Sequence, residues 1–153
     1  MAFPLATATA SAAPTGTNGT TRVPLKNVLR TCGFSLVLSN VQMDRSDASV
    51  SAVIRATGGT VSAEVHLSDP SKPGTHYDVR LIQAPRESQS PCGPGAPGVA
   101  VGSLDSDGAG QATTTLQDSI RSGTTGVWVL VERPGPFSQD PAEYYTSDFI
   151  ASV

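Results

Sequence analysis

The chain has 153 residues, enough for one domain with a buried core. Only 15% of the residues are charged and 5% are aromatic, so Val, Leu, Ile and Ala must supply the core, while Ser, Thr, Gly and Pro supply the polarity. This composition favours short strands joined by turns and excludes a protein built from long helices. The net charge is −3 and the basic residues are scattered singly, which excludes an electrostatic surface for nucleic acid.

The N-terminal residues 1–24 are expected to lie outside the domain, either as a disordered leader or as the remaining tail of a signal peptide. Ala10-Ser11-Ala12 has the small-x-small form of a signal-peptidase site, although no basic region precedes it. Residues 13–24 are rich in Thr, Gly and Pro, which is typical of disorder. No stretch approaches the roughly 18 apolar residues of a membrane span. We therefore expect one exported domain over residues 25–153 that does not span a membrane.

Apolar and polar residues alternate with a period of two along the rest of the chain, in about eight segments separated by turn residues. The segment over residues 127–131 is apolar at every position, which is typical of a central strand. The pattern predicts an all-β fold, an antiparallel β-sandwich with polar outer faces. In chain order, the expected strands cover residues 34–43, 50–54, 61–67, 77–81, 99–104, 112–116, 127–131 and 145–151.

The two cysteines, Cys32 and Cys92, permit one disulfide, the alternative being two reduced and unrelated thiols. The bridge would close a loop of about 60 residues, constrain the unfolded chain by roughly 4 kcal/mol, and anchor the Pro/Gly-rich loop over residues 85–98. Disulfides persist in oxidising compartments, which agrees with an extracellular or cell-envelope location. Together with Trp128 on a central strand, the bridge resembles the core of immunoglobulin domains, although Trp128 follows both cysteines here. The expected architecture is therefore immunoglobulin-like.

The two histidines of the chain, His66 and His76, fall on successive expected strands. If these strands form a hairpin that aligns their apolar faces, His66 lies opposite His76 and Glu64 lies opposite Asp78, with Cβ atoms about 5 Å apart. Two imidazoles and two carboxylates are an acceptable ligand set for zinc or copper. The alternative is an ordinary polar sheet face that binds no metal.

The usual signatures of catalysis are missing. The sequence has no G-x-S-x-G elbow, no phosphate-binding loop, no C-x-x-C and no H-x-x-x-H. The stretch from Asp105 to Gly108 begins like a calcium-binding loop, but the fifth and twelfth positions of that pattern are Ala109 and Leu116, which offer no side-chain oxygen. It therefore predicts a hairpin turn. We expect a protein that is not an enzyme.

Two loop segments are candidates for ligand contact. The loop over residues 85–98 carries Arg86 and Glu87, and loops longer than about 12 residues are usually functional or disordered. The second segment, around residues 134–144, carries Phe137 and Tyr144 among prolines, a combination that can form a recognition surface. The sequence thus predicts a secreted or surface-exposed binding module that contacts an unidentified protein or surface ligand through its end loops. The alternatives are a zinc- or copper-binding protein using the two histidines and a structural subunit of a surface or particle assembly.

Overall fold

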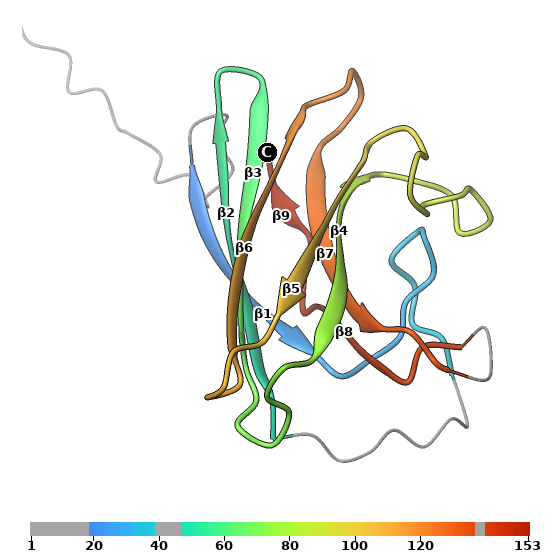
Figure 1. Ribbon diagram of the computed structural model, residues 1–153. Helices are drawn as coiled ribbons and strands as arrows, with labels where there is room; N and C mark the ends of the chain where they lie inside the picture. The colour runs from blue at the N-terminus through green and yellow to red at the C-terminus, as the bar shows by residue number, and fades with distance from the viewer. Residues whose placement is uncertain (1–18, 39–46, 137–139) are drawn as a thin grey trace, which may run out of the picture.

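The protein is built from antiparallel strands (Figure 1). The computed structural model describes residues 19–38, 47–136 and 140–153. These residues contain no helix, and hence none that could cross a membrane. The all-β prediction is confirmed. The strands are β1 (Thr20–Lys26), β2 (Ser49–Thr57), β3 (Thr60–Ser68), β4 (His76–Ala84), β5 (Val99–Asp105), β6 (Gln111–Ser119), β7 (Gly126–Arg133), β8 (Glu143–Ser147) and β9 (Ala151–Ser152).

The strands form two layers that join along one side. Hydrogen bonds connect them in the order β5-β4-β7-β8-β1-β2-β3-β6, with β9 paired to β7. Strand β1 belongs to both layers, because residues 20–24 pair with β2 while residues 25 and 26 pair with β8. On the other side, β5 approaches β6 so closely that a Cβ on Gly102 would lie 3.2 Å from the Leu116 side chain. The sandwich is therefore a sheet nearly closed into a barrel.

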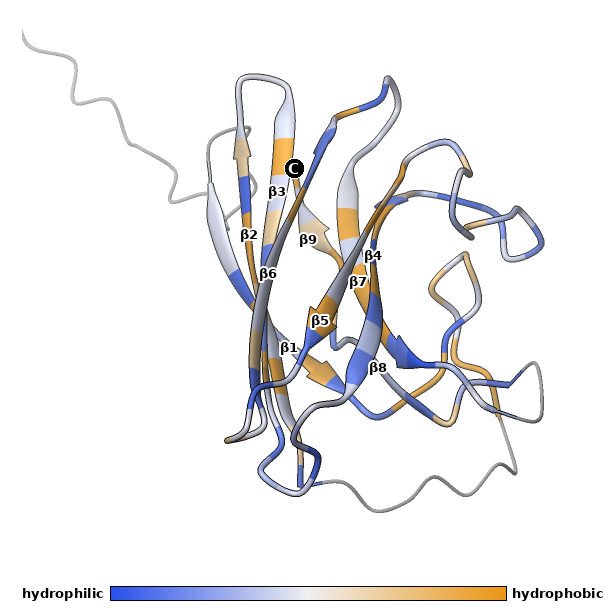
Figure 2. Cartoon of the chain, in the orientation of Figure 1, coloured by the Kyte–Doolittle hydropathy of each residue, from blue (hydrophilic) through white to orange (hydrophobic). Residues whose placement is uncertain are grey.

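The main core lies between the two layers. In β3, burial alternates at every residue, as its sequence predicts. Figure 2 shows hydrophobic and hydrophilic residues following one another along the strands. The apolar side chains of β3 therefore meet those of β4 and β7 across the interior. The fully buried members include Val61, Ala63, Val65, Tyr77, Leu81, Val127, Val129 and Val131.

The domain begins earlier than the sequence predicts. Residues 20–24, expected to be a disordered leader, form most of β1. This stretch is rich in Thr and Pro, which is why it was expected to be disordered. It nevertheless supplies two buried apolar side chains with the residue that follows it: Val23 and Leu25 are only 1% and 6% exposed. Pro24, which has no amide hydrogen, lies where β1 leaves β2 and turns to β8, and a missing donor is tolerated at such a place. Residues 1–18, with the expected signal-peptidase site, lie outside the described residues.

The strand expected over residues 34–43 is not formed at its described residues, 34–38. Residues 34–38 contribute only an isolated bridge between Arg30 and Leu36, and residues 39–43 lie outside the described part of the chain. The strand expected over residues 145–151 is also divided in two. Its halves, β8 and β9, pair with different parts of β7, so the chain leaves the sheet between them. The other expected strands are confirmed.

Candidate functional site

The predicted disulfide between Cys32 and Cys92 is present, with Cα atoms 5.6 Å apart. It joins two loops that cover the outward face of β4 and β7, and together they enclose a second hydrophobic cluster outside the barrel. This cover explains why residues 127–131 of β7 are all apolar: Val127 and Val129 face the barrel interior, whereas Trp128 packs under the loops. The bridge thus holds the loop over residues 85–98 against the sheet.

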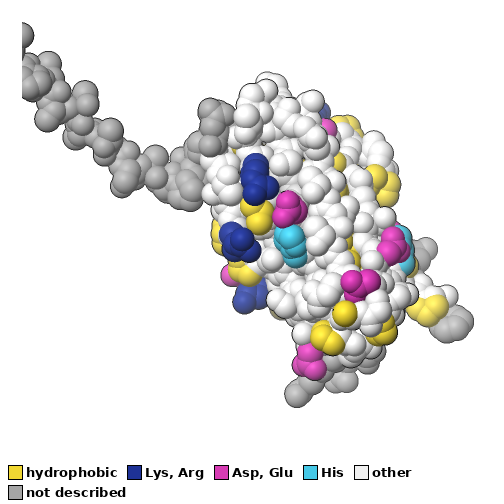
Figure 3. Space-filling view, turned by 60° about the vertical axis from the view of Figure 1, so that its left-hand side comes forward, with side chains coloured by type: hydrophobic (Ala, Val, Ile, Leu, Met, Phe, Trp, Pro, Cys, Tyr) yellow, Lys and Arg dark blue, Asp and Glu magenta, His cyan; other side chains and the backbone are white. Residues whose placement is uncertain are grey.

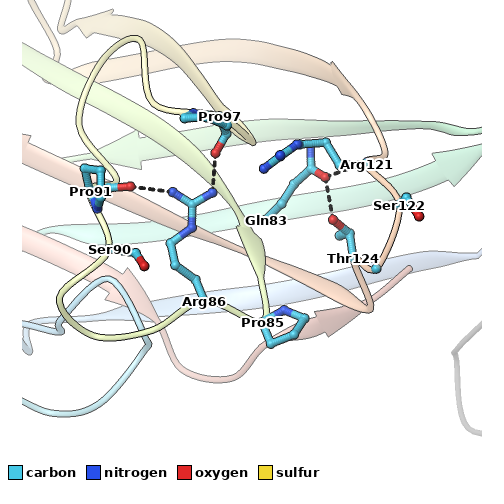
Figure 4. A pocket seen from close by; sticks show the side chains of 10 residues that line it. Gln83, Pro85, Arg86, Ser90, Pro91, Pro97, Arg121, Ser122 and Thr124 are labelled. Carbon is cyan, nitrogen blue, oxygen red and sulfur yellow. Dashed lines mark hydrogen bonds between the residues drawn. The ribbon is translucent and has the colours of Figure 1, made fainter.

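A pocket of about 520 Å³ opens between this loop and the β6–β7 connection (Figure 4). Three prolines, three hydroxyl side chains and Gln83 contribute to its lining, together with the arginines Arg86 and Arg121. The prolines stiffen one wall because their φ angles are fixed. Volumes in this range are typical of small-molecule sites.

Gln83, from the end of β4, fixes one wall of the pocket although its side chain is buried. Its Oε1 accepts hydrogen bonds from the Arg121 backbone amide at 2.9 Å and from Thr124 Oγ1 at 2.8 Å. Its Nε2 donates to Asp118 Oδ2 at 3.1 Å and to the Ser119 carbonyl at 2.8 Å. The amide therefore uses its whole hydrogen-bonding capacity to hold the end of β6 and the β6–β7 connection. This role of Gln83 was not among the predictions, although a glutamine inside an apolar run is a signal for a buried polar contact.

Arg86 organises the opposite wall. Its Nη1 donates to the Pro91 carbonyl at 2.7 Å, and its Nη2 donates to the Pro97 carbonyl (Figure 4). The loop is thus folded around this guanidinium group. Burial, followed by the positive charge of Arg121, lowers the pKa of Arg86, which indicates that the two cations lie close together.

The guanidinium groups of Arg86 and Arg121 converge above Gly98. A Cβ on this glycine would lie 2.8 Å from Arg86 Nη2 and 3.3 Å from Arg121 Nη1. Gly98 also has a φ of 73°, so only glycine fits without strain here. Within the described residues, neither arginine forms an ion pair with a carboxylate. The pocket therefore holds two positive charges with no internal counter-charge.

The four residues expected on binding loops lie in different environments. Arg86 lines the pocket, whereas Glu87 lies exposed in the same loop without lining it. Tyr144 is only 7% exposed, because β8 buries it instead of presenting it on a loop. Phe137 lies outside the described residues. Tyr144 nevertheless lines another pocket, of about 510 Å³, together with residues 27–29 and 36–38. Of the two candidate segments, the first has the pocket whose walls are held by hydrogen bonds from Arg86 and Gln83.

The expected hairpin between the two histidine-bearing strands is wrong, because β3 pairs with β2 and β6 while β4 pairs with β5 and β7. The connection between β3 and β4 crosses from one layer to the other. It is held against the β5–β6 connection by hydrogen bonds such as Asp69 N to Gly110 O at 2.8 Å. The four proposed metal ligands are consequently divided between two layers.

Each histidine instead binds acidic side chains of its own layer. His66 Nε2 lies 2.7 Å from Glu64 Oε1, and Figure 3 shows one such histidine beside an acidic side chain on a largely uncharged face. His76 lies between Asp105 and Asp78, at 2.7 and 3.0 Å. Among the described residues, no group of three or more His, Cys, Asp or Glu side chains could hold a metal ion.

A buried ion network lies at the other end of the barrel, where Figure 1 shows the β3–β4 connection. Glu143 is 1% exposed and lies 3.1 Å from Lys72 Nζ and 3.2 Å from Arg133 Nε. Tyr145 also donates its hydroxyl to Glu143. Burial, and then the charge of Glu143, raises the pKa of Tyr77 to about 12. Asp69, which is also buried, lies 3.8 Å from Lys72 Nζ, so the two carboxylates of the network are balanced by its two cations. The network therefore closes the barrel end and leaves no charge for a ligand.

Comparison of the chain with protein-family models, with curated proteins and with solved structures finds no match. Function is therefore inferred from the residues of the pocket alone.

Proposed function

We propose that this protein is an exported, non-catalytic binding module whose ligand enters the pocket between the 85–98 loop and the β6–β7 connection. One observation carries the proposal: both walls of the pocket are fixed by the protein itself. The disulfide and Arg86 hold one wall, and Gln83 holds the other. A preformed pocket loses little conformational entropy when a ligand binds, which favours affinity.

The chemistry of the lining favours binding over catalysis. Its polar groups are hydroxyls, an amide and guanidinium groups. Among the described residues that line it, there is no His, Cys, Asp or Glu to act as a general base, and a serine hydroxyl needs such a partner to become a nucleophile. The disulfide is compatible with an extracellular location, which supports the proposed export.

The proposal is tested by blocking the pocket without altering its charge. A library of small polar compounds, both neutral and charged, is screened against the oxidised protein by ligand-observed NMR. The hits are then measured on Ser122→Trp, which places a large side chain at an exposed position of the lining, and on Thr57→Trp, an equally exposed position at the β2–β3 turn. We expect Ser122→Trp to abolish binding of the hits and Thr57→Trp to retain it. A screen without hits, or hits that bind Ser122→Trp unchanged, would overturn the proposal.

A further inference from the structure

We infer that the pocket binds a tetrahedral oxyanion with two negative charges, a phosphate or sulfate group, between the guanidinium groups of Arg86 and Arg121. The inference rests on the proposed function, since it names the ligand class of the same pocket. It goes further by assigning the role of ligand-contacting residues to these two arginines.

Neither Arg86 nor Arg121 has a carboxylate partner among the described residues. Among the described residues, Arg55, Arg80 and Arg133 pair with Glu64, Glu132 and Glu143, whereas Arg22 and Arg30, like the two pocket arginines, form no ion pair with a carboxylate. The pocket arginines differ from these two because their guanidinium groups lie beside each other. The chain also has 13 acidic residues against 10 Lys and Arg, so carboxylates are not scarce. The described residues nevertheless leave both pocket arginines without one. Two like charges that lie this close repel each other, and a bound anion would relieve that repulsion.

The N–H groups of Arg86 and Arg121 are arranged as donors to one ligand. Two N–H groups of Arg86 are bonded to the carbonyls of Pro91 and Pro97, which fixes the plane of the guanidinium and leaves its remaining N–H groups for a ligand. Arg121 presents its guanidinium beside the same point, and its side chain makes no hydrogen bond within the described residues. Because Gly98 has no side chain, both guanidinium groups can pack close to its backbone. A fixed donor and a free donor thus face one small space.

The two cations of the pocket favour an anion with two negative charges. A single carboxylate would neutralise only one of the two cations, whereas a doubly charged oxyanion matches both. Its oxygens point in four directions, so it can accept hydrogen bonds from both guanidinium groups at once. Guanidinium groups bind phosphate and similar oxyanions through paired, charge-assisted hydrogen bonds. The lining therefore suits a phosphate or sulfate group better than a carboxylate.

The test uses inorganic phosphate, inorganic sulfate and acetate as probes, each titrated at constant ionic strength against chloride and followed by amide chemical shifts of the oxidised protein. We expect phosphate and sulfate to cause saturable shifts in residues 85–98 and 119–125, with acetate binding at least about tenfold more weakly. Arg121→Gln should weaken the binding of phosphate and sulfate by about tenfold or more, as expected for a lost charge-assisted hydrogen bond. Arg22→Gln is the matched control, because it removes the same charge from an exposed site on β1 and should leave binding unchanged.

The dependence of binding on pH distinguishes a phosphate group from a sulfate group. Phosphate loses part of its second charge below its second pKa of about 6, whereas sulfate does not. A drop in phosphate affinity, but not in sulfate affinity, at about pH 5.5 shows that the second charge of phosphate is recognised. Equal binding of acetate, no saturable binding of either dianion, or equal affinities of Arg121→Gln and Arg22→Gln would overturn the inference. If neutral library compounds then still bind and Ser122→Trp still blocks them, the proposed function stands while the anion assignment fails.

Discussion

Phe34 meets the indole ring of Trp128 edge-on, with ring centroids 5.3 Å apart and ring planes inclined by 61°. On the same phenyl ring, the guanidinium carbon of Arg30 lies 3.8 Å from the centroid. Phe34 has a φ of 73°, a conformation that costs free energy for a bulky residue. The contacts with both neighbours, and the disulfide two residues earlier, offset that cost. The cover over Trp128 therefore forms a second core, outside the barrel.

Replacing Phe34 with alanine should expose one side of Trp128. We expect Phe34→Ala to lower the free energy of unfolding by about 2 kcal/mol, less than for a fully buried phenylalanine, because this ring is only partly covered. Trp128 is the only tryptophan, so its fluorescence reports this site alone and should shift to the red. Phe149→Ala is the control, because its ring is 43% exposed. Equal stability and unchanged emission in the two variants would contradict the assigned packing.

The regular strands are predictable because their information is local. In β3, every second residue is apolar, and the buried face follows directly from the period of two. The two cysteines were paired correctly, since no other disulfide was available to them. The failures involve partners that are distant in the sequence. The histidines were placed opposite each other by assuming that successive strands form a hairpin, but the connection between those strands crosses to the other layer.

Only one wall of the pocket could be predicted from the sequence, because the other wall depends on partners that are distant in the sequence. The 85–98 loop and Arg86 could be singled out from loop length and composition. Arg121 and Gln83 could not, because their roles depend on the β6–β7 connection folding back onto the end of β4, a contact between segments about 40 residues apart that no periodicity encodes.

Removing the disulfide should loosen the pocket wall without unfolding the barrel. The bridge spans 60 residues, so the double variant Cys32→Ser/Cys92→Ser should lose about 4 kcal/mol of unfolding free energy in the loop-entropy model. The far-UV circular dichroism spectrum should persist, because the main core contains neither cysteine. Hydrogen exchange should accelerate in residues 85–98 and remain slow in β3. Chemically reduced wild-type protein serves as the second measurement, and an 85–98 loop that stays as protected as before in both samples would refute the anchoring role.

Replacing Gln83 with leucine should release the other wall. The two side chains are similar in size, so the main loss is that of four hydrogen bonds, two to the end of β6 and two to the β6–β7 connection. We expect Gln83→Leu to cost about 2–4 kcal/mol in urea denaturation. The amide of Arg121 should also exchange faster. Gln117→Leu, at an exposed position of β6, is the matched control and should change stability by less than about 0.5 kcal/mol. Comparable losses in both variants would show that Gln83 does not hold the connection.

The surface cluster around His76 should make stability depend weakly on pH. Two hydrogen bonds raise the pKa of His76 above its ordinary value of 6.5: the one to Asp105 has the larger effect, and the one to Asp78 comes second. Because the pKa is higher in the folded than in the unfolded protein, the stabilisation is fully present below about pH 6.5 and is lost as the pH rises through the folded pKa. The effect should be small and should weaken with salt, since the imidazole is 52% exposed.

NMR titration of the His76 ring checks this directly. Asp105→Asn should lower the pKa of His76 toward 6.5, and Asp78→Asn should lower it less, following the order of the two causes. Urea denaturation of wild type and His76→Gln on either side of neutral pH should show the difference in stability shrinking as the pH rises, because only the wild type loses the charged pair. A pKa of His76 at or below 6.5, or one that Asp105→Asn leaves unchanged, would mean that the two carboxylates do not hold the imidazolium in solution. In that case, the β4–β5 edge would carry three independent surface side chains, and no pH-dependent difference between wild type and His76→Gln should remain.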